Sequence, residues 1–568
     1  MDSRLRSVLL VGGLVALGYF LFFRKSEHPV PPDQRYATAP AAAERGNEQT
    51  VPIETGGLTA TVSTYSGTLH NLRIVHPQFR DQRTGQAMNI STTRFEYATP
   101  LRTDIVFERD GRNVLPSYLT FRVESSARRR VELVATPDGS DIEVRRAIRG
   151  AADFSFIVRT TVINHGTPGR VRVGQSLFHW VARSEESGGF FRQSWQVTEG
   201  VCRAAGDGRI FRNNREDLRY WNDGVFRNAQ FVALGNLYML SALVPLGGDE
   251  AACHLRSQDG YRGDEATGSL VRGSLSWRPS VIERGASRDF LVLAYFGPKL
   301  GATLAAAAAP LREAVNLGFF AIIARLLLRL LQALYAFVHN WGVAIMLLTV
   351  IVRLTLFPLL ARSTKTMAMM QKLKPELDVL NEKFKDNQEQ KGLATMELYR
   401  KHKVNPLSGC LPQLAQLPIW WALYTTLQTS VELFHAPFTL WWRDLSAPDP
   451  YYVLPLTLGA VMFVQSKLMP PAMPDPMQQK MMLYFMPVFL TAISLFLPAG
   501  LALYMLTNSA LAIVQQRITK AQIDKIVKAA PGDAIEVKPL PSTDSAQLGK
   551  GNPRSGADKK GVRRAGRK

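Results

Sequence analysis

Arg353 is the residue with the clearest chemical potential, because it lies inside an apolar stretch that covers residues 341–361. An arginine near the middle of a membrane-spanning helix costs about 2.5–3.5 kcal/mol on insertion scales, so it usually faces protein or a water-filled cavity. In such a cavity it could attract acidic groups and offset the desolvation of polar chain segments. The alternative is a snorkelling side chain whose guanidinium group reaches toward the membrane surface.

Further polar and aromatic residues recur at helical spacing. Thr349 precedes Arg353 by about one turn on the same helix face. Two later apolar stretches each have a stripe: Gln413, Gln416, Trp420, Tyr424 and Gln428 in the first, and Tyr504, Asn508 and Gln515 in the second. Three such helices can converge on one hydrophilic groove, because polar groups that face lipid lack partners. Hydrogen bonding between the helices of a dry bundle is the alternative interpretation.

Motifs of enzymatic chemistry are absent from the sequence. There is no GxSxG, HExxH or Walker A pattern, and no carboxylate pair lies within the apolar stretches. The nine histidines are scattered, which is typical of surface or packing residues. We therefore expect a protein that is not an enzyme and that uses no cofactor or metal.

The charge distribution indicates which side of the membrane each segment between the apolar stretches faces. The 568-residue chain has a net charge of +21, and 18 of its 20 lysines follow residue 360. Because Lys and Arg are enriched in cytoplasmic loops of membrane proteins, the lysine-containing segments between apolar stretches are predicted to lie inside the cell. The mean hydropathy of −0.04 averages a polar first half and an apolar second half.

The first half of the chain is predicted to be an anchored, water-facing β domain. Residues 1–25 indicate an uncleaved signal-anchor helix, and 26–56 has the Pro- and Ala-rich composition of a linker. Alternating stretches within 57–300 are typical of an antiparallel β-sandwich. Cys202 and Cys253 lie in this region, either as a disulfide or as two buried thiols.

The second half is predicted to be a transmembrane bundle. Residues 312–338 indicate an amphipathic helix in the membrane interface, since Arg325 and Arg329 share one face. The alternation of apolar stretches and lysine-containing segments then gives six spans in total. The remaining elements are a span at 341–361, a cytoplasmic helical hairpin at 362–408, spans at 411–434 and 452–468 joined by a periplasmic loop at 435–451, a cytoplasmic loop at 469–481, spans at 482–497 and 501–517, and a basic cytoplasmic tail at 518–568.

Several ordered motifs in residues 341–517 resemble the YidC/Oxa/Alb family of membrane protein insertases. They are TVIVRLTLFPLLARSTKTMAMMQKLKPEL, KVNPLSGCLPQLAQLPIWWALYTTL, WWRDLSAPDPYYVLPL, DPMQQKMM and LPAGLALYMLTNSALAIVQQ. A signal anchor followed by a large β domain is similar to the Gram-negative form of the family. In that form the β domain is periplasmic and adopts an all-β supersandwich related to sugar-binding folds.

The resemblance implies a multi-domain inner-membrane protein whose five-helix core encloses a hydrophilic groove. The groove would be open to the cytoplasm and to lipid and closed to the periplasm. Arg353 matches the groove arginine of the family, Thr349 matches its groove threonine, and the hairpin matches a mobile element needed for client capture. Where relatives often have two tyrosines in the last span, this chain has Tyr504 followed by Met505.

The sequence-based prediction is thus an insertase and chaperone for nascent inner-membrane proteins, which acts alone or with the Sec translocon, as a monomer. The tail from 545 to 568 has eight Lys and Arg residues against one Asp, a charge that suits ribosomal RNA or anionic lipid. A secondary transporter that binds an anionic solute through Arg353 is the alternative. A sugar-binding envelope sensor is a third interpretation, which depends on the β domain alone.

Overall fold

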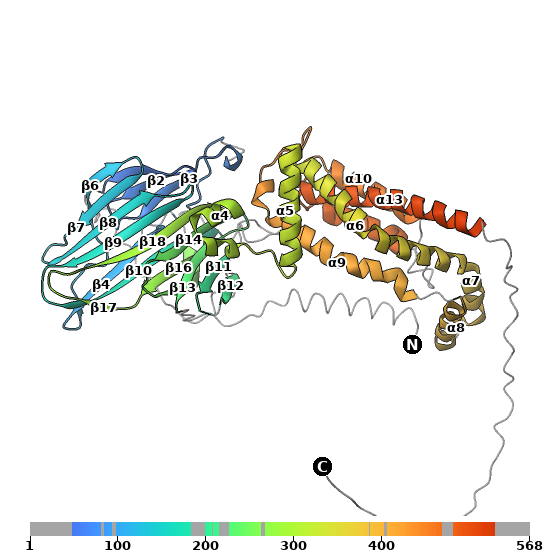
Figure 1. Ribbon diagram of the computed structural model, residues 1–568, viewed down its shortest axis with the longest axis horizontal. Helices are drawn as coiled ribbons and strands as arrows, with labels where there is room; N and C mark the ends of the chain where they lie inside the picture. Colours follow the sequence, from blue (N-terminus) through green and yellow to red (C-terminus); the bar gives the residue numbers. More distant parts are fainter. Residues whose placement is uncertain are drawn as a thin grey trace, which may run out of the picture.

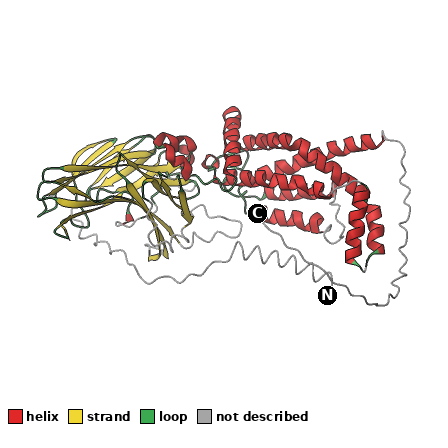
Figure 2. Cartoon of the chain, turned by 60° about the horizontal axis from the view of Figure 1, so that its bottom comes forward, coloured by secondary structure: helices red, strands yellow, loops and turns green. Residues whose placement is uncertain are grey.

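The computed structural model describes residues 48–80, 85–91, 93, 98–182, 199–206, 208–214, 227–262, 267–385, 387–402, 406–468 and 481–528. Strands fill the first half of this part and helices the second (Figures 1 and 2). The predicted signal anchor, most of the predicted linker and cytoplasmic loop, and residues 529–568 of the predicted tail lie outside the described residues.

The β domain is built from three antiparallel sheets. The nine-stranded sheet has the order β12-β11-β13-β14-β18-β9-β8-β7-β6, the six-stranded sheet is β15-β16-β10-β4-β5 with β17 paired to β10, and the third sheet is β1-β2-β3. The strands are β1 (Thr50–Glu54), β2 (Leu58–Ser63), β3 (Leu69–Ile74), β4 (Arg102–Arg109), β5 (Arg112–Asn113), β6 (Arg122–Ala127), β7 (Arg130–Ala135), β8 (Ile142–Gly150), β9 (Ser155–Asn164), β10 (Gly169–Ala182), β11 (Glu199–Ala204), β12 (Ile210–Asn214), β13 (Ala229–Gly235), β14 (Met239–Leu246), β15 (Ala251–Arg262), β16 (Thr267–Trp277), β17 (Ser280–Ile282) and β18 (Ser287–Pro298).

Strand β8 illustrates how the alternating pattern builds the core. Ile142, Val144 and Ile148 are buried, whereas Arg145 and Arg149 on the opposite face are exposed. Arg146 is the exception, because it lies on the inner face and is 1% exposed. Its guanidinium group donates to the carbonyl of Leu101 at 2.7 Å and to the hydroxyl of Thr103. Burial lowers the pKa of Arg146 to about 9, since water no longer solvates its charge.

A disulfide between Cys202 and Cys253 connects the two large sheets, which resolves the alternatives that the sequence left open. Cys202 belongs to β11 in the nine-stranded sheet, and Cys253 belongs to β15 in the six-stranded sheet. Their Cα atoms are 6.2 Å apart, within the range that a disulfide requires.

The β domain begins earlier than the composition of residues 26–56 predicts. β1 lies inside that range and pairs with β2, with Ile53 opposite Ala60. Ile53 is 2% exposed, so its burial favours the strand. Pro52 interrupts the local pattern but is tolerated because β1 lies at the edge of its sheet.

The connection to the helical half also differs from the expected single helix at 312–338. After β18 come α4 (Gly301–Ala307) and the 3₁₀ helix η4 (Ala309–Ala314), and α5 (Ala321–Val338) begins only after them. Gly318 has a φ of +70°, a left-handed conformation that glycine adopts easily and that breaks the helix.

The helical half is a bundle with a short helix pair at the end away from the β domain (Figure 1). Its members are α6 (Trp341–Lys372), α7 (Lys374–Lys383), α8 (Gln388–Lys401), α9 (Pro406–Thr429), the 3₁₀ helix η5 (Val431–Leu433), α10 (Val453–Leu468), the π-helix η6 (Met481–Phe485), α12 (Met486–Ser494) and α13 (Ala499–Lys528). α6 packs against α5, α9 and α13, and α10 packs against α12 and α13. α5 runs across the direction of these helices (Figure 1).

Some helices extend beyond the predicted spans. α6 continues past residue 361 to Lys372, α9 begins at Pro406 and α13 continues past residue 517 to Lys528. Hydrophobicity marks where a helix can contact lipid, whereas polar residues of high helix propensity let the same helix continue into water. Among the described residues, two helices are long and apolar enough to cross a membrane, Ala321–Val338 and Trp341–Pro358.

The pair α7 and α8 packs through a small cluster of Leu373, Leu377 and Tyr399. Asn387 begins α8, because its side-chain oxygen accepts from the backbone N–H of Gln390 at 3.1 Å.

Candidate functional site

Arg353 lies on α6 and points toward α13. One guanidinium nitrogen donates to the backbone carbonyl of Asn508 at 3.0 Å, and the side chain is only partly buried. Its Nε is buried and has no hydrogen-bond partner among the described residues, and none of their carboxylates forms an ion pair with it. Arg353 is thus a cation within an apolar helix, and its Nε has no hydrogen-bond partner among the described residues.

Thr349 and Tyr504 lie beside Arg353 but are covered by protein. Thr349 is 2% exposed and donates its hydroxyl to the carbonyl of Ile345, one turn earlier in α6, at 2.7 Å. Tyr504 is 3% exposed and lies close enough to Arg353 for an electrostatic interaction between them. Thr349 and Tyr504 therefore contribute to the buried side of the environment of Arg353 and are not accessible at the protein surface.

The stripe on α9 forms a second group. Trp420 and Tyr424 stack with ring centroids 5.9 Å apart, and Tyr424 shares a hydrogen bond with Gln428. All three are partly exposed. The backbone of α9 includes Gln413 and Gln416, but their side chains lie outside the described part of the chain.

On α13, the predicted residues differ in accessibility. Met505 and Asn508 are partly exposed, whereas Gln515 is 7% exposed. Met505 packs against the apolar core of the bundle. The structure therefore brings Arg353, Tyr504 and Asn508 together between α6 and α13, with the aromatic stripe on the neighbouring helix α9.

Two polar contacts of α5 were missed by the sequence reasoning. The hydroxyl of Thr426, which is fully buried, donates to the carbonyl of Ala324 at 3.3 Å. The amide of Gln332 donates to the carboxylate of Glu432 at 2.7 Å. The sequence shows polar residues in the predicted segments 312–338 and 411–434, but which of them pair depends on how α5 crosses α9.

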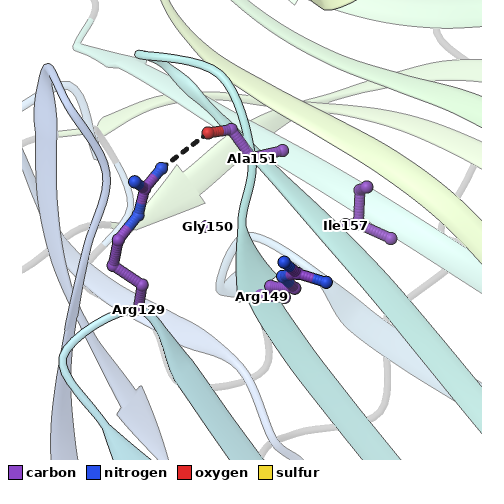
Figure 3. A pocket seen from close by; sticks show the side chains of 5 residues that line it. All are labelled: Arg129, Arg149, Gly150, Ala151 and Ile157. Atoms are coloured by element: carbon purple, nitrogen blue, oxygen red, sulfur yellow. Dashed lines mark hydrogen bonds between the residues drawn. The ribbon is translucent and has the colours of Figure 1, made fainter.

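The β domain has an open hollow of about 480 Å³ lined by Arg129, Arg149, Gly150, Ala151 and Ile157 (Figure 3). Arg129 donates to the carbonyl of Ala151 at 2.7 Å. The lining is cationic and contains no acid, thiol or hydroxyl group, so it is suited to contact with an anion rather than to acid–base chemistry. No group of three His, Cys, Asp or Glu residues able to hold a metal occurs in the described residues.

Known proteins match both halves of the chain. The membrane protein insertase YidC of Anaeromyxobacter dehalogenans is 36% identical over 500 residues, which are 86% of this chain and 87% of that protein. The chain belongs to the YidC family of membrane protein insertases. The YidC of Geobacter metallireducens is 32% identical over 573 residues, which are 93% of this chain and 99% of that protein.

The two family models meet within α5, the first helix of the helical half. The YidC periplasmic domain matches residues 50–330, and the 60Kd inner membrane protein model matches residues 333–526. A crystal structure of an active YidC insertase with its first transmembrane domain resolved is 19% identical, with a TM-score of 0.35, and covers 90% of this chain and 98% of that chain. The predicted family and its β-rich periplasmic domain followed by a helical region are confirmed.

Proposed function

We propose that this YidC family member inserts nascent inner-membrane proteins, and helps them fold, through a hydrophilic groove centred on Arg353. The observation that supports this proposal is the incompletely bonded guanidinium group of Arg353 inside the apolar helix α6. A cation in this position is costly unless it faces polar partners or water. A client's acidic segment would supply such partners transiently.

In the proposed mechanism, the hydrophilic segment of a client crosses a shorter thickness of apolar bilayer. A hydrophilic terminus or loop of the client enters the groove, where Arg353, Asn508 and Gln428 replace part of its hydration. The client's apolar helix meanwhile slides along the outer faces of α9 and α12 into lipid. Those faces offer exposed Leu417, Trp421, Val488 and Phe489. Transfer of apolar surface into the bilayer drives insertion, so no nucleotide or other cofactor is needed.

The topology that fits this mechanism has six crossings: the predicted signal anchor, α6, α9, α10, the 482–497 segment and α13. The lysine-rich pair α7 and α8 would be cytoplasmic, and the β domain and residues 435–451 would be periplasmic. The position of α7 and α8 at the opposite end of the bundle from the β domain supports this assignment (Figure 1). α5 would lie in the interface, because it runs across the bundle and exposes Arg325 and Arg329.

The partners of the protein follow from this topology. We propose that the cytoplasmic helix pair and the basic tail contact ribosomal RNA or anionic lipid. The chain would work as a monomer, either alone or beside the Sec translocon.

The test is a depletion strain rescued by Arg353→Ala, Arg353→Lys or the matched control Arg329→Ala. We expect Arg353→Ala to lose insertion of clients with acidic translocated segments, Arg353→Lys to retain part of it, and Arg329→Ala to behave as the parent. Full rescue of every client by Arg353→Ala would refute the role of the groove charge. A crosslinker at Gln428 that never captured a nascent chain would refute the route.

A secondary transporter for an anionic solute is the alternative function, because the same unpartnered Nε of Arg353 could bind an anion. Anion uptake into proteoliposomes that is abolished by Arg353→Ala would favour it. Missing uptake together with successful client insertion would exclude it.

A further inference from the structure

The hollow at Arg149 lies at the end of the nine-stranded sheet from which the chain continues to the bundle. At that end Gly150 of β8 is opposite Phe156 of β9, and Ser155 of β9 is opposite Tyr295 of β18. β18 then ends, and the chain passes through α4 and η4 into α5. The hollow and the start of the connection to α5 thus share one end of the sheet.

A chain of hydrogen bonds connects the same end of the β domain to the bundle. The N–H of Gly57, in the turn after β1, donates to the carbonyl of Asp153 at 2.8 Å, and the carbonyl of Gly57 accepts from Val75 at 2.9 Å. Just beyond Val75, the side-chain amide of Gln78 donates to the carbonyl of Phe434 at 2.8 Å. In the proposed topology, this end of the β domain is the one nearest to the membrane surface.

Arg149 differs from the arginines around it, because it forms no ion pair with a carboxylate of the described residues. It is exposed on the outer face of β8 and lies directly opposite Arg130 of β7. Like charges in opposite positions destabilise an antiparallel strand pair unless they are balanced. The neighbouring arginines are balanced in the pairs Arg128–Glu54, Arg130–Glu132 and Arg145–Glu143. An anion bound at Arg149 would supply the balance that this position lacks.

Arg129 provides a second guanidinium group at the same hollow (Figure 3). Its bond to the carbonyl of Ala151, at 2.7 Å, uses one nitrogen and holds the side chain in place. A guanidinium group has further N–H donors in a planar fork, which matches two oxygens of a phosphate group. Two such groups that line one hollow are suited to a tetrahedral oxyanion.

The size and remaining lining of the hollow indicate a ligand larger than a bare phosphate ion. Its volume of about 480 Å³ falls within the range of roughly 300–1,000 Å³ that is typical of small-ligand sites. Ile157 adds an apolar wall, and Gly150 contributes backbone alone. A Cβ atom on Gly150 would lie 2.7 Å from the carbonyl oxygen of Glu54, so a side chain there would have to displace β1.

We propose that Arg129 and Arg149 form a binding site for the phosphate group of a phosphate ester, whose carbon-containing part contacts Ile157. Two sources share this chemistry: the headgroup of a phospholipid at the periplasmic membrane surface, and a free phosphate ester. The lipid source rests on the proposed interfacial position of α5. The site is an addition to the insertion function, and client insertion does not depend on it.

The experiment measures hydrogen exchange of the backbone amides in 149–157, in the full chain, during titration with glycerol 3-phosphate in a phosphate-free maltoside detergent. This local readout does not respond to binding at the basic tail. We expect glycerol 3-phosphate to slow exchange, glycerol to have no effect, and Arg149→Gln to weaken the titration by at least about tenfold. Arg149→Lys should fall between the two, because it keeps the charge but loses the planar fork.

Arg145→Gln is the matched control, since Arg145 is exposed on the same face of β8 but is paired with Glu143 at 2.6 Å. It should titrate as the parent does. Arg129→Lys provides a second variant, which keeps a donor for the carbonyl of Ala151 and should also weaken binding. Unchanged titration in Arg149→Gln, or equal weakening in Arg145→Gln and Arg149→Gln, would overturn the site.

Nanodiscs of phosphatidylglycerol and phosphatidylcholine, without glycerol 3-phosphate, distinguish the two sources. Slow exchange in 149–157 that Arg149→Gln abolishes would assign the site to the lipid headgroup. Slow exchange that requires added glycerol 3-phosphate would assign it to a free ester. Protection in neither condition would refute the proposal. Because the assay contains no client, its outcome is independent of the proposed groove.

Discussion

Removing the disulfide between Cys202 and Cys253 should destabilise the β domain strongly. The two residues are 51 positions apart, and a cross-link that closes a loop of this size lowers the conformational entropy of the unfolded chain by an amount worth about 4 kcal/mol. Both side chains are almost fully buried, so replacement by alanine also leaves a small cavity between the sheets. For a domain of roughly 250 residues, this loss corresponds to a fall of about 10 °C in the Tm.

The assay is thermal unfolding of the full chain in detergent, with the double variant Cys202→Ala, Cys253→Ala compared with the parent and with Cys410→Ala as the control. Thiol alkylation after denaturation separately counts the free cysteine thiols. Since the chain has three cysteines, the parent should react once without reductant, at Cys410, and three times after reduction. Three reactive thiols without reductant, or an unchanged Tm in the double variant, would refute the reasoning. The bond also requires an oxidising compartment, which agrees with a periplasmic β domain.

Three further predictions concern single side chains. Burial lowers the pKa of His179 to about 4, so between pH 6.5 and 4 this residue binds a proton in the unfolded chain but not in the folded chain. The free energy of unfolding should therefore fall by on the order of 3 kcal/mol as the pH is lowered across this window. In His179→Gln, denaturant titrations at several pH values should no longer show this part of the pH dependence. Arg146→Met should leave the free energy of unfolding nearly unchanged, because the carbonyl of Leu101 still accepts from Gln175 at 2.7 Å. Arg146→Ala should lower it by about 3 kcal/mol, because it also leaves a cavity. Equal losses in both variants would contradict this reasoning. Gly342→Ala should accelerate hydrogen exchange in the loop 435–451, because its Cβ would overlap the Phe438 ring, and adding Phe438→Ala should relieve the overlap; no change in the single variant would contradict the packing.

The sequence was most informative where structure follows from local spacing. Alternating residues predicted strands such as β7 and β9, and motifs in a fixed order within 341–517 predicted the family. Predictions were weaker at element boundaries: β1 was read as linker, and the helix expected from 312 begins at Ala321. In both cases a local composition signal was overridden, by strand pairing for β1 and by the left-handed turn at Gly318 for the helix.

The sequence by itself determined that an arginine lies within an apolar helix, that polar residues follow it at helical spacing, and that a β domain precedes the bundle. These properties depend on periodicity and composition, which can be recognised within short segments of the sequence. Only the tertiary structure decided that Arg353 bonds to a backbone carbonyl of α13, that Thr349 and Tyr504 are buried, and that Cys202 pairs with Cys253. It also brought Gln78 to carbonyls more than 350 residues away. Such contacts depend on how separate elements pack, and a backbone carbonyl has no side-chain identity that a sequence pattern could reveal.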